Sequence, residues 1–124
     1  MKPKVSVNEG WTTIDAVVNL KDGLCMRPSG KIVLECSKYP KKIFFKTYVD
    51  EFGDVSEKHD CSSIVDVMDA GAEFGTKIRI FVEGEDDEAE RFALRFYSAV
   101  TDGYEDFTYD PNFDMYEAYY RKEK

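Results

Sequence analysis

The pattern of apolar and polar positions along the chain predicts four β-strands. Residues 11–20 are rich in β-branched side chains and alternate loosely between apolar and polar positions. Residues 76–82 alternate strictly, which is typical of a strand with one buried face. Residues 42–49 are also strand-like, and the turn signal at Gly53 allows residues 55–59 to return as a weaker strand. The middle of the chain is therefore predicted to form a hairpin.

Two shorter stretches have the apolar spacing of helices. The first begins beside Pro28, which suits the first turn because its missing N–H needs no partner there, and it ends before Pro40. The second begins at a capping serine, Ser62 or Ser63, and ends at Gly71 after about two turns. Each is expected to bury one face, made by the following apolar side chains: Ile32, Val33 and Cys36 in the first helix and Ile64, Val67 and Met68 in the second.

A third helix is predicted after Gly84. The acidic run at 85–88 suits a helix N-terminus electrostatically. One apolar stripe follows at helical spacing: Ala89, Phe92, Ala93, Phe96 and Val100. The order β-α-β-β-α-β-α indicates an α+β two-layer domain, a four-stranded antiparallel sheet with its helices on one face.

The C-terminal residues 101–124 differ from the rest of the chain. They mix acidic residues with seven aromatics and show no clean period. We interpret them as an acidic, aromatic extension that folds back on its own domain or on a neighbouring subunit, with a possible short helix at 115–121. Every predicted core stripe ends by Val100, so the domain is expected to cover residues 1–100.

Charge and composition limit the possible functions. The 124 residues suit one domain, and 17 basic against 25 acidic residues give a net charge of -8, which disfavours contacts to a nucleic-acid backbone. No apolar run is long enough for a membrane span or a signal peptide, so we expect a cytoplasmic protein. Three cysteines without CxxC spacing and a single histidine make disulfide and zinc frameworks improbable, and no metal or cofactor is expected.

The motif GLCMRP at residues 23–28 resembles the GLHARP segment of HPr, the histidine-containing phosphocarrier of the bacterial sugar phosphotransferase system. Further likeness lies in the end of the first helix, in the second helix at 63–68 and in the later glycine turns, and together it spans residues 13–100. The resemblance implies the open-faced HPr sandwich and protein partners of the phosphotransferase or carbon-regulation system.

Three features depart from the family pattern. Cys25 stands where the family carries its phosphate-accepting histidine, the hairpin is longer by about seven residues, and residues 101–124 have no counterpart. The resemblance therefore implies a member that has lost histidine phosphotransfer and acts as a regulatory or binding module, not as an enzyme. Within the family, catabolite repression HPr-like proteins also keep the fold without the histidine.

Cys25 itself has two readings. A thiol near a helix N-terminus and beside Arg27 is biased towards the thiolate, so Cys25 could accept phosphate or respond to oxidants, with Arg27 stabilising the anion and Pro28 fixing the helix entry. The alternative, which we favour, is that a small residue fills the vacated position without chemistry, because transfer depends on close geometric matching.

Two further sites follow from the resemblance. Ser63 aligns with the serine phosphorylated by the family's kinase, although capping alone also explains a serine there and Asp60 would repel a phosphate. By the same analogy, exposed parts of Met26, Ile64 and Met68 are expected to form a docking patch around the degenerate site.

Other polar residues receive simpler interpretations. We expect His59 to be an exposed polar residue rather than a displaced phosphate acceptor. The basic cluster of Lys38, Lys41, Lys42 and Lys46 is interpreted first as a solvated hairpin edge and second as a docking surface.

Overall fold

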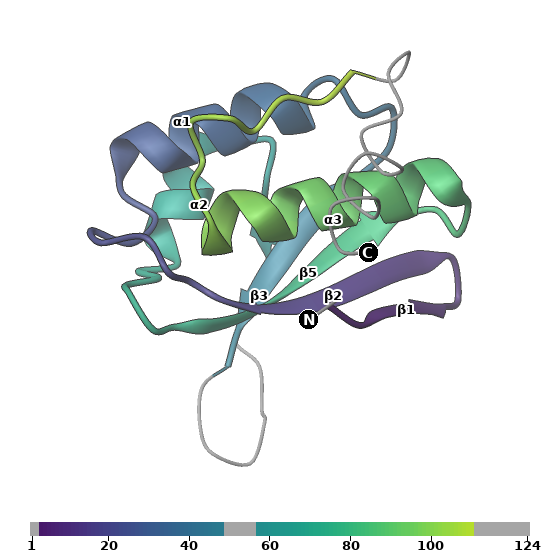
Figure 1. Cartoon of the computed structure of the whole chain (residues 1–124), viewed down its shortest axis with the longest axis horizontal. Coiled ribbons are helices and arrows are strands. Elements are labelled where there is room, and N and C mark those ends of the chain that lie inside the picture. Colours follow the sequence, from purple (N-terminus) through teal and green to yellow (C-terminus); the bar gives the residue numbers. More distant parts are fainter. Residues whose placement is uncertain (1–2, 49–56, 111–124) are drawn as a thin grey trace.

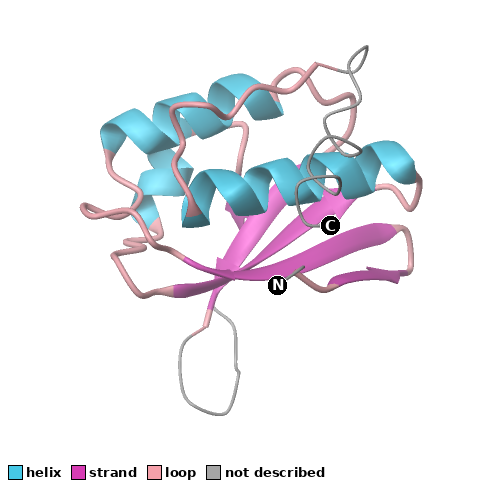
Figure 2. Cartoon of the chain, viewed as in Figure 1, coloured by secondary structure: helices cyan, strands magenta, loops and turns pink. Residues whose placement is uncertain are grey.

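The computed structural model describes residues 3–48 and 57–110 of the chain. It contains two layers, a twisted antiparallel sheet and three helices that cover one face of it (Figures 1 and 2). The sheet order is β1-β2-β5-β3-β4, with the strands β1 (Val5–Asn8), β2 (Trp11–Val17), β3 (Ile43–Thr47), β4 (His59–Asp60) and β5 (Lys77–Glu83). The helices are α1 (Met26–Cys36), α2 (Ile64–Asp69) and α3 (Asp87–Thr101). The predicted α+β fold is therefore confirmed.

The sheet of the described residues has five strands instead of the predicted four. The additional strand, β1, pairs antiparallel with β2 in the register Val5 opposite Ile14 and Asn8 opposite Trp11. Three of its four residues are exposed, because it is an edge strand that buries little against the helices. Its sequence, VSVN, alternates as a strand does but over only four residues, a run too short to be recognised from the pattern.

The hairpin prediction is confirmed only in part. β3 pairs with β4, with Phe45 opposite His59. The returning strand, β4, overlaps the predicted stretch 55–59 only at His59 and ends one residue later, at Asp60. The Gly53 turn lies outside the described residues, since the structure does not cover residues 49–56.

The core lies between the sheet and the helices. The predicted inner face of β5 is confirmed, because Ile78, Ile80 and Val82 are all fully buried. The predicted stripe of α3 is buried from Ala89 to Val100, and the Asp86 side chain caps the helix by accepting the Ala89 N–H at 3.0 Å. For β5 and α3, the residues that the sequence pattern places inside are therefore the ones that the structure buries.

The core does not end at Val100, contrary to the expectation from the sequence. Phe107 and Tyr109 are buried, and their rings lie 5.8 and 4.9 Å from the Phe92 ring. We call residues 102–110 the strap. Figure 1 shows it leaving α3 and running along α1. The expected short helix at 115–121 lies outside the described residues.

A membrane span would need a long apolar helix, and none of the helices in the described part of the chain has the required length and hydropathy.

Candidate functional site

The loop before α1 is held rigidly against the loop after α2. The Leu24 N–H donates to the Ala72 carbonyl at 2.8 Å, and the Ser29 hydroxyl donates to the Leu24 carbonyl at 2.9 Å. Gly23 has a φ of 67°, and a Cβ on it would lie 2.8 Å from the Glu73 Cα. Only glycine fits this crossing, which fixes where the next residue, Cys25, begins the helix.

Cys25 is the N-cap residue of α1. Its backbone is extended, its side chain makes no capping hydrogen bond, and it is exposed. Arg27 is the second helical residue and is exposed, whereas Pro28 is buried as the third residue, within the first turn as expected from the sequence. Because Pro28 has no N–H and the first helical bond runs from the Ser29 N–H to the Cys25 carbonyl, the donors without an acceptor inside the helix at this end are those of Cys25, Met26 and Arg27.

An open groove at Cys25 carries mixed charge. Two basic side chains line it, Lys21 and Arg27, and so do three acidic side chains from two parts of the chain: Asp22, Asp102 and Glu105. The last two belong to the strap, which lies beyond the residues 13–100 that carry the sequence resemblance. The groove is therefore not a cluster of positive charge, and its acidic residues oppose the binding of an anion.

The strap residues at this groove were missed by sequence reasoning. Asp102 and Glu105 follow α3 directly, in a stretch without period or motif. The only available signal was the aromatic content of residues 101–124, which suggested folding back without indicating the place of contact.

Ser63 is the N-cap residue of α2. Its hydroxyl oxygen accepts the Asp66 N–H at 3.2 Å, so the capping interpretation of this serine is confirmed. Ser63 is half-buried, whereas Ser62 is exposed and its N–H donates to the Asp60 carboxylate at 2.9 Å. Ser63 does not line the groove at Cys25, since the two sites lie at different ends of the pair α1 and α2.

Acidic groups surround the start of α2. The Asp66 carboxylate accepts the Asp60 N–H at 2.7 Å, and this hydrogen bond and the neighbouring His59 lower the pKa of Asp66. The expectation that His59 is exposed is wrong, because its side chain is only 12% exposed and its ring lies 5.4 Å from the Phe45 ring. The sequence could not show this, because the ring is covered by the strand β3 and by α2.

Apolar side chains are exposed on α1 and α2. Met26, Ile64 and Met68 are 69%, 42% and 37% exposed, as a docking patch would require. The predicted apolar face of α2 is correspondingly corrected, since only Val67 of that face is buried. Further exposed apolar residues were not predicted: Leu34 on α1, Val65 on α2 and Phe74 in the loop after α2.

No group of three or more potential metal ligands occurs among the residues that the structure covers.

Comparisons with known proteins place this site in a family context. The family model described as the PTS HPr component phosphorylation site matches residues 12–97. A search among curated proteins found no match.

Several solved HPr structures are similar to the chain. The HPr of Bacillus anthracis is 26% identical, with a TM-score of 0.54, over 72% of this chain and 99% of that protein. The histidine-containing phosphocarrier protein of a mycoplasma is 24% identical, with a TM-score of 0.54, over 73% of this chain and 99% of that protein. HPr-C-His of Thermoanaerobacter tengcongensis is 21% identical, with a TM-score of 0.55, over 72% of this chain and 93% of that protein. Because the family model covers most of the chain and the architecture agrees with it, the chain belongs to the HPr family of the phosphotransferase system.

Proposed function

We propose that this HPr-family protein does not carry phosphohistidine and acts as a regulatory binding module for proteins of the phosphotransferase or carbon-regulation system. One observation carries the proposal: the N-cap residue of α1, which the resemblance assigns to the phosphate-accepting histidine, is Cys25. A phosphoryl group on histidine needs a ring nitrogen as its acceptor. The one histidine of the chain, His59, lies on β4 and does not line the groove.

The charge of the groove supports the same proposal. A phosphoryl group carries close to two negative charges at neutral pH. In the groove it would meet the carboxylates of Asp22, Asp102 and Glu105 as well as the Arg27 guanidinium. Like charges in the same groove disfavour the phosphorylated state, so the surroundings of Cys25 suit a docking surface better than a phosphate relay.

The docking surface we propose is the exposed rim of α1 and α2. Met26, Ile64 and Met68 provide its apolar part, and Arg27 provides a charged, planar group next to it. Methionines adapt their shape to different partners, and a rim of this size suits a modest, transient interface.

Ser63 is the regulatory residue in this proposal. A phosphate there would lie at the N-terminus of α2, where the helix dipole favours negative charge. The carboxylates of Asp60 and Asp66 oppose it, so phosphorylation would strain the start of α2 while adding charge beside Ile64. Phosphorylation is thus suited to altering the proposed docking surface.

Intact-mass spectrometry tests the loss of phosphotransfer. The full chain is incubated with phosphoenolpyruvate, the first enzyme of the phosphotransferase system and Mg²⁺, with a HPr protein that contains the histidine as a positive control. We expect no phosphoryl adduct on this chain under conditions that phosphorylate the control. An adduct that survives in Cys25→Ser would contradict the proposal.

A second function, a thiol-based phosphocarrier or redox-responsive protein using Cys25 with Arg27, is favoured by one observation. Cys25 is exposed, whereas Cys36 and Cys61 are buried. In the same experiment, an adduct that is lost in Cys25→Ser would support this alternative against the binding module.

The regulatory part is tested with the family's kinase and ATP. We expect Ser63 to be modified and Ser62 to remain unmodified, as read by peptide mapping. Binding of the kinase should weaken in Met68→Asp, in the proposed docking surface, but not in the matched control Val17→Asp, which places a charge at an exposed position of β2. If the kinase modifies neither serine, or if both variants bind equally, this part of the proposal is wrong.

A further inference from the structure

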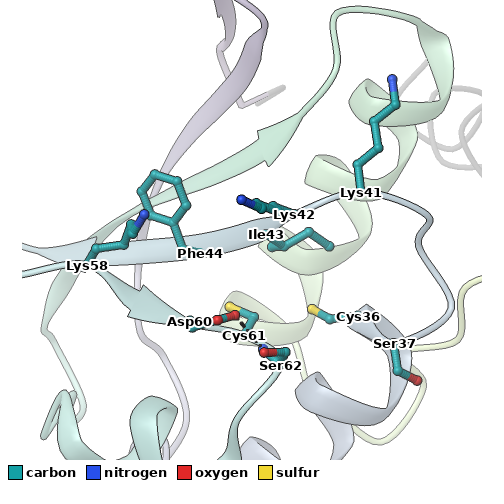
Figure 3. Close-up of a pocket in the computed structure, with 10 residues that line it drawn as sticks. All are labelled: Cys36, Ser37, Lys41, Lys42, Ile43, Phe44, Lys58, Asp60, Cys61 and Ser62. Atoms are coloured by element: carbon teal, nitrogen blue, oxygen red, sulfur yellow. Dashed lines mark hydrogen bonds between the residues drawn. The ribbon is translucent and has the colours of Figure 1, made fainter.

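A pocket of about 370 Å³ lies between the end of α1, the strands β3 and β4 and the start of α2. Its apolar floor includes Ile43, Cys36 and Cys61, all buried. Figure 3 shows the two sulfur atoms and the Ile43 side chain gathered at one place. The pocket shares no lining residue with the groove at Cys25.

The floor is uncharged. Burial raises the pKa of the Cys61 thiol well above its ordinary value, and the neighbouring Cys36 thiol raises this pKa further. Cys61 therefore stays protonated at neutral pH and presents a small apolar surface instead of a thiolate. A ligand on this floor is held by apolar contact.

The rim of the pocket is basic. Lys41, Lys42 and Lys58 line it against a single acid, Asp60, although the chain as a whole carries a net charge of -8. The ammonium groups of Lys41 and Lys42 make no ion pair with another described residue. The Lys58 ammonium lies 4.9 Å from the centre of the Phe44 ring, which holds it at the rim.

Two of the three lysines, Lys42 and Lys58, are better placed than Lys41 to contact one ligand in the pocket. In Figure 3, Lys42 and Lys58 extend on the side of the pocket where Phe44 lies, while Lys41 extends away from them. The opposing carboxylate of Asp60 is engaged by the Ser62 N–H at 2.9 Å. The exposed Ser62 lies beside this acid and also lines the pocket.

We propose that this pocket binds a small organic phosphate monoester. The apolar part of the ligand would rest on Ile43 and the two thiols, and its phosphate would be held by Lys42 and Lys58. Lysine binds phosphate as a compact point charge, and two ammonium groups together offset the charge of a phosphate dianion, which is larger than that of a carboxylate. The volume falls at the small end of the roughly 300–1,000 Å³ typical of ligand pockets. This inference does not depend on the fate of Cys25 or Ser63.

Amide NMR shifts of the unphosphorylated full chain provide the test, with phenyl phosphate as the probe. We expect saturable shifts at Cys36, Ile43 and Cys61, and weaker binding as the salt concentration rises. Inorganic phosphate and benzyl alcohol, which each retain only one half of the probe's chemistry, should bind more weakly than phenyl phosphate. Equal binding of either one would overturn the assigned ligand class.

Variants locate the binding. Lys42→Gln and Lys58→Gln should each weaken phenyl phosphate binding by about two- to fivefold, as expected for one exposed charge pair. The matched control, Lys77→Gln, removes an exposed lysine of β5 outside the pocket and should leave binding unchanged. The proposal is overturned if no saturable shifts occur or if the shifts centre on Cys25 and Arg27 instead. It is also overturned if a variant with both Lys42→Gln and Lys58→Gln binds phenyl phosphate as well as the wild type.

Discussion

At the scale of single residues, Glu35 shows how a charged side chain can hold two distant segments together. It is almost fully buried on α1, where both carboxylate oxygens accept from the Lys38 ammonium at 3.0 Å. One of the oxygens also accepts the Tyr109 N–H at 2.6 Å, which fixes the strap to the helix. A buried carboxylate is tolerated only because it is paired and hydrogen-bonded in this way.

We therefore expect Glu35→Ala to lower the free energy of unfolding by about 2–3 kcal/mol, because the buried Tyr109 N–H loses its acceptor and a cavity is left. Glu35→Gln should cost less, since one amide oxygen can still accept the Tyr109 N–H. Urea unfolding of the three proteins measures the difference. If both variants lower the free energy of unfolding equally, the hydrogen bond that the Tyr109 N–H donates does not contribute to stability.

Asp15 gives a prediction about pH. Its carboxylate accepts the Arg79 Nε–H at 2.7 Å and the Tyr48 hydroxyl at 3.0 Å, and the Arg79 hydrogen bond lowers the pKa of Asp15 below its ordinary value of 3.8. The pair contributes stability above this ordinary value and loses it as the pH falls through the lowered pKa. It is exposed, so its contribution should stay below about 1 kcal/mol.

In unfolding experiments across the acid range, wild type should be slightly more stable than Asp15→Asn near neutral pH, and the difference should vanish in strong acid. Arg79→Gln is the matched control, because it removes the other half of the pair and should abolish the effect of Asp15→Asn. A difference that grows as the pH falls would contradict this account.

Residues such as Glu35 could not be identified from the sequence. The apolar spacing of Ile32, Val33 and Cys36 predicted which side of α1 faces inward, and Ile32 and Cys36 are buried there. An acid between them is read as a surface residue by any hydropathy pattern. Its burial depends on the strap, more than 70 positions away, and no local signal reports that contact.

At the scale of elements, α2 depends strongly on its cap. It is six residues long, and an isolated helix of this length is unstable in water. The Ser63 hydroxyl satisfies one of its four free N–H groups, that of Asp66. Loss of this bond should therefore be felt throughout the short helix.

We expect Ser63→Ala to lower the free energy of unfolding by about 1 kcal/mol, whereas Ser63→Asp should cost less because aspartate is also a good N-cap residue. Ser62→Ala is the control and should change stability by less than about 0.5 kcal/mol, since its side chain is exposed. Thermal or urea unfolding reads the series. If Ser62→Ala lowers the free energy of unfolding as much as Ser63→Ala does, Ser63 is not the residue that caps α2.

The elements with strong local signals were the predictable ones. α3 has a buried stripe, an acidic first turn and a capping aspartate, and β5 alternates without a break. β1 also alternates, but over only four residues, and as an edge strand it gains its stability from pairing with β2 and not from burying a stripe. The sequence therefore predicted the central strands of the sheet but not the edge strand β1.

At the scale of the whole molecule, the strap changes where the folding unit ends. The sequence predicts that a chain ending at Val100 still folds, because all the expected stripes are complete by then. Phe107 and Tyr109, however, are part of the core and pack on Phe92 of α3. Their removal would expose the apolar surface that they cover.

We now expect the chain ending at Val100 to be less stable than the chain ending at Asp110 by at least about 3 kcal/mol, the cost of removing one buried aromatic side chain. Both chains lack residues 111–124, so the comparison isolates the contribution of residues 101–110. Urea unfolding curves provide the measurement. Equal stability would mean that the strap only covers a core that is complete without it.

The carboxylates that the strap brings to Cys25 also have a consequence for rebuilding a phosphate carrier on this fold. A histidine installed by Cys25→His would share the groove with Asp102 and Glu105, and a phosphoryl group on its ring would meet their negative charge. The single substitution would then be insufficient, and Asp102 and Glu105 would have to be neutralised as well. The start of α1 and the strap are in this sense coupled, so an engineer who changes one of them has to redesign the other.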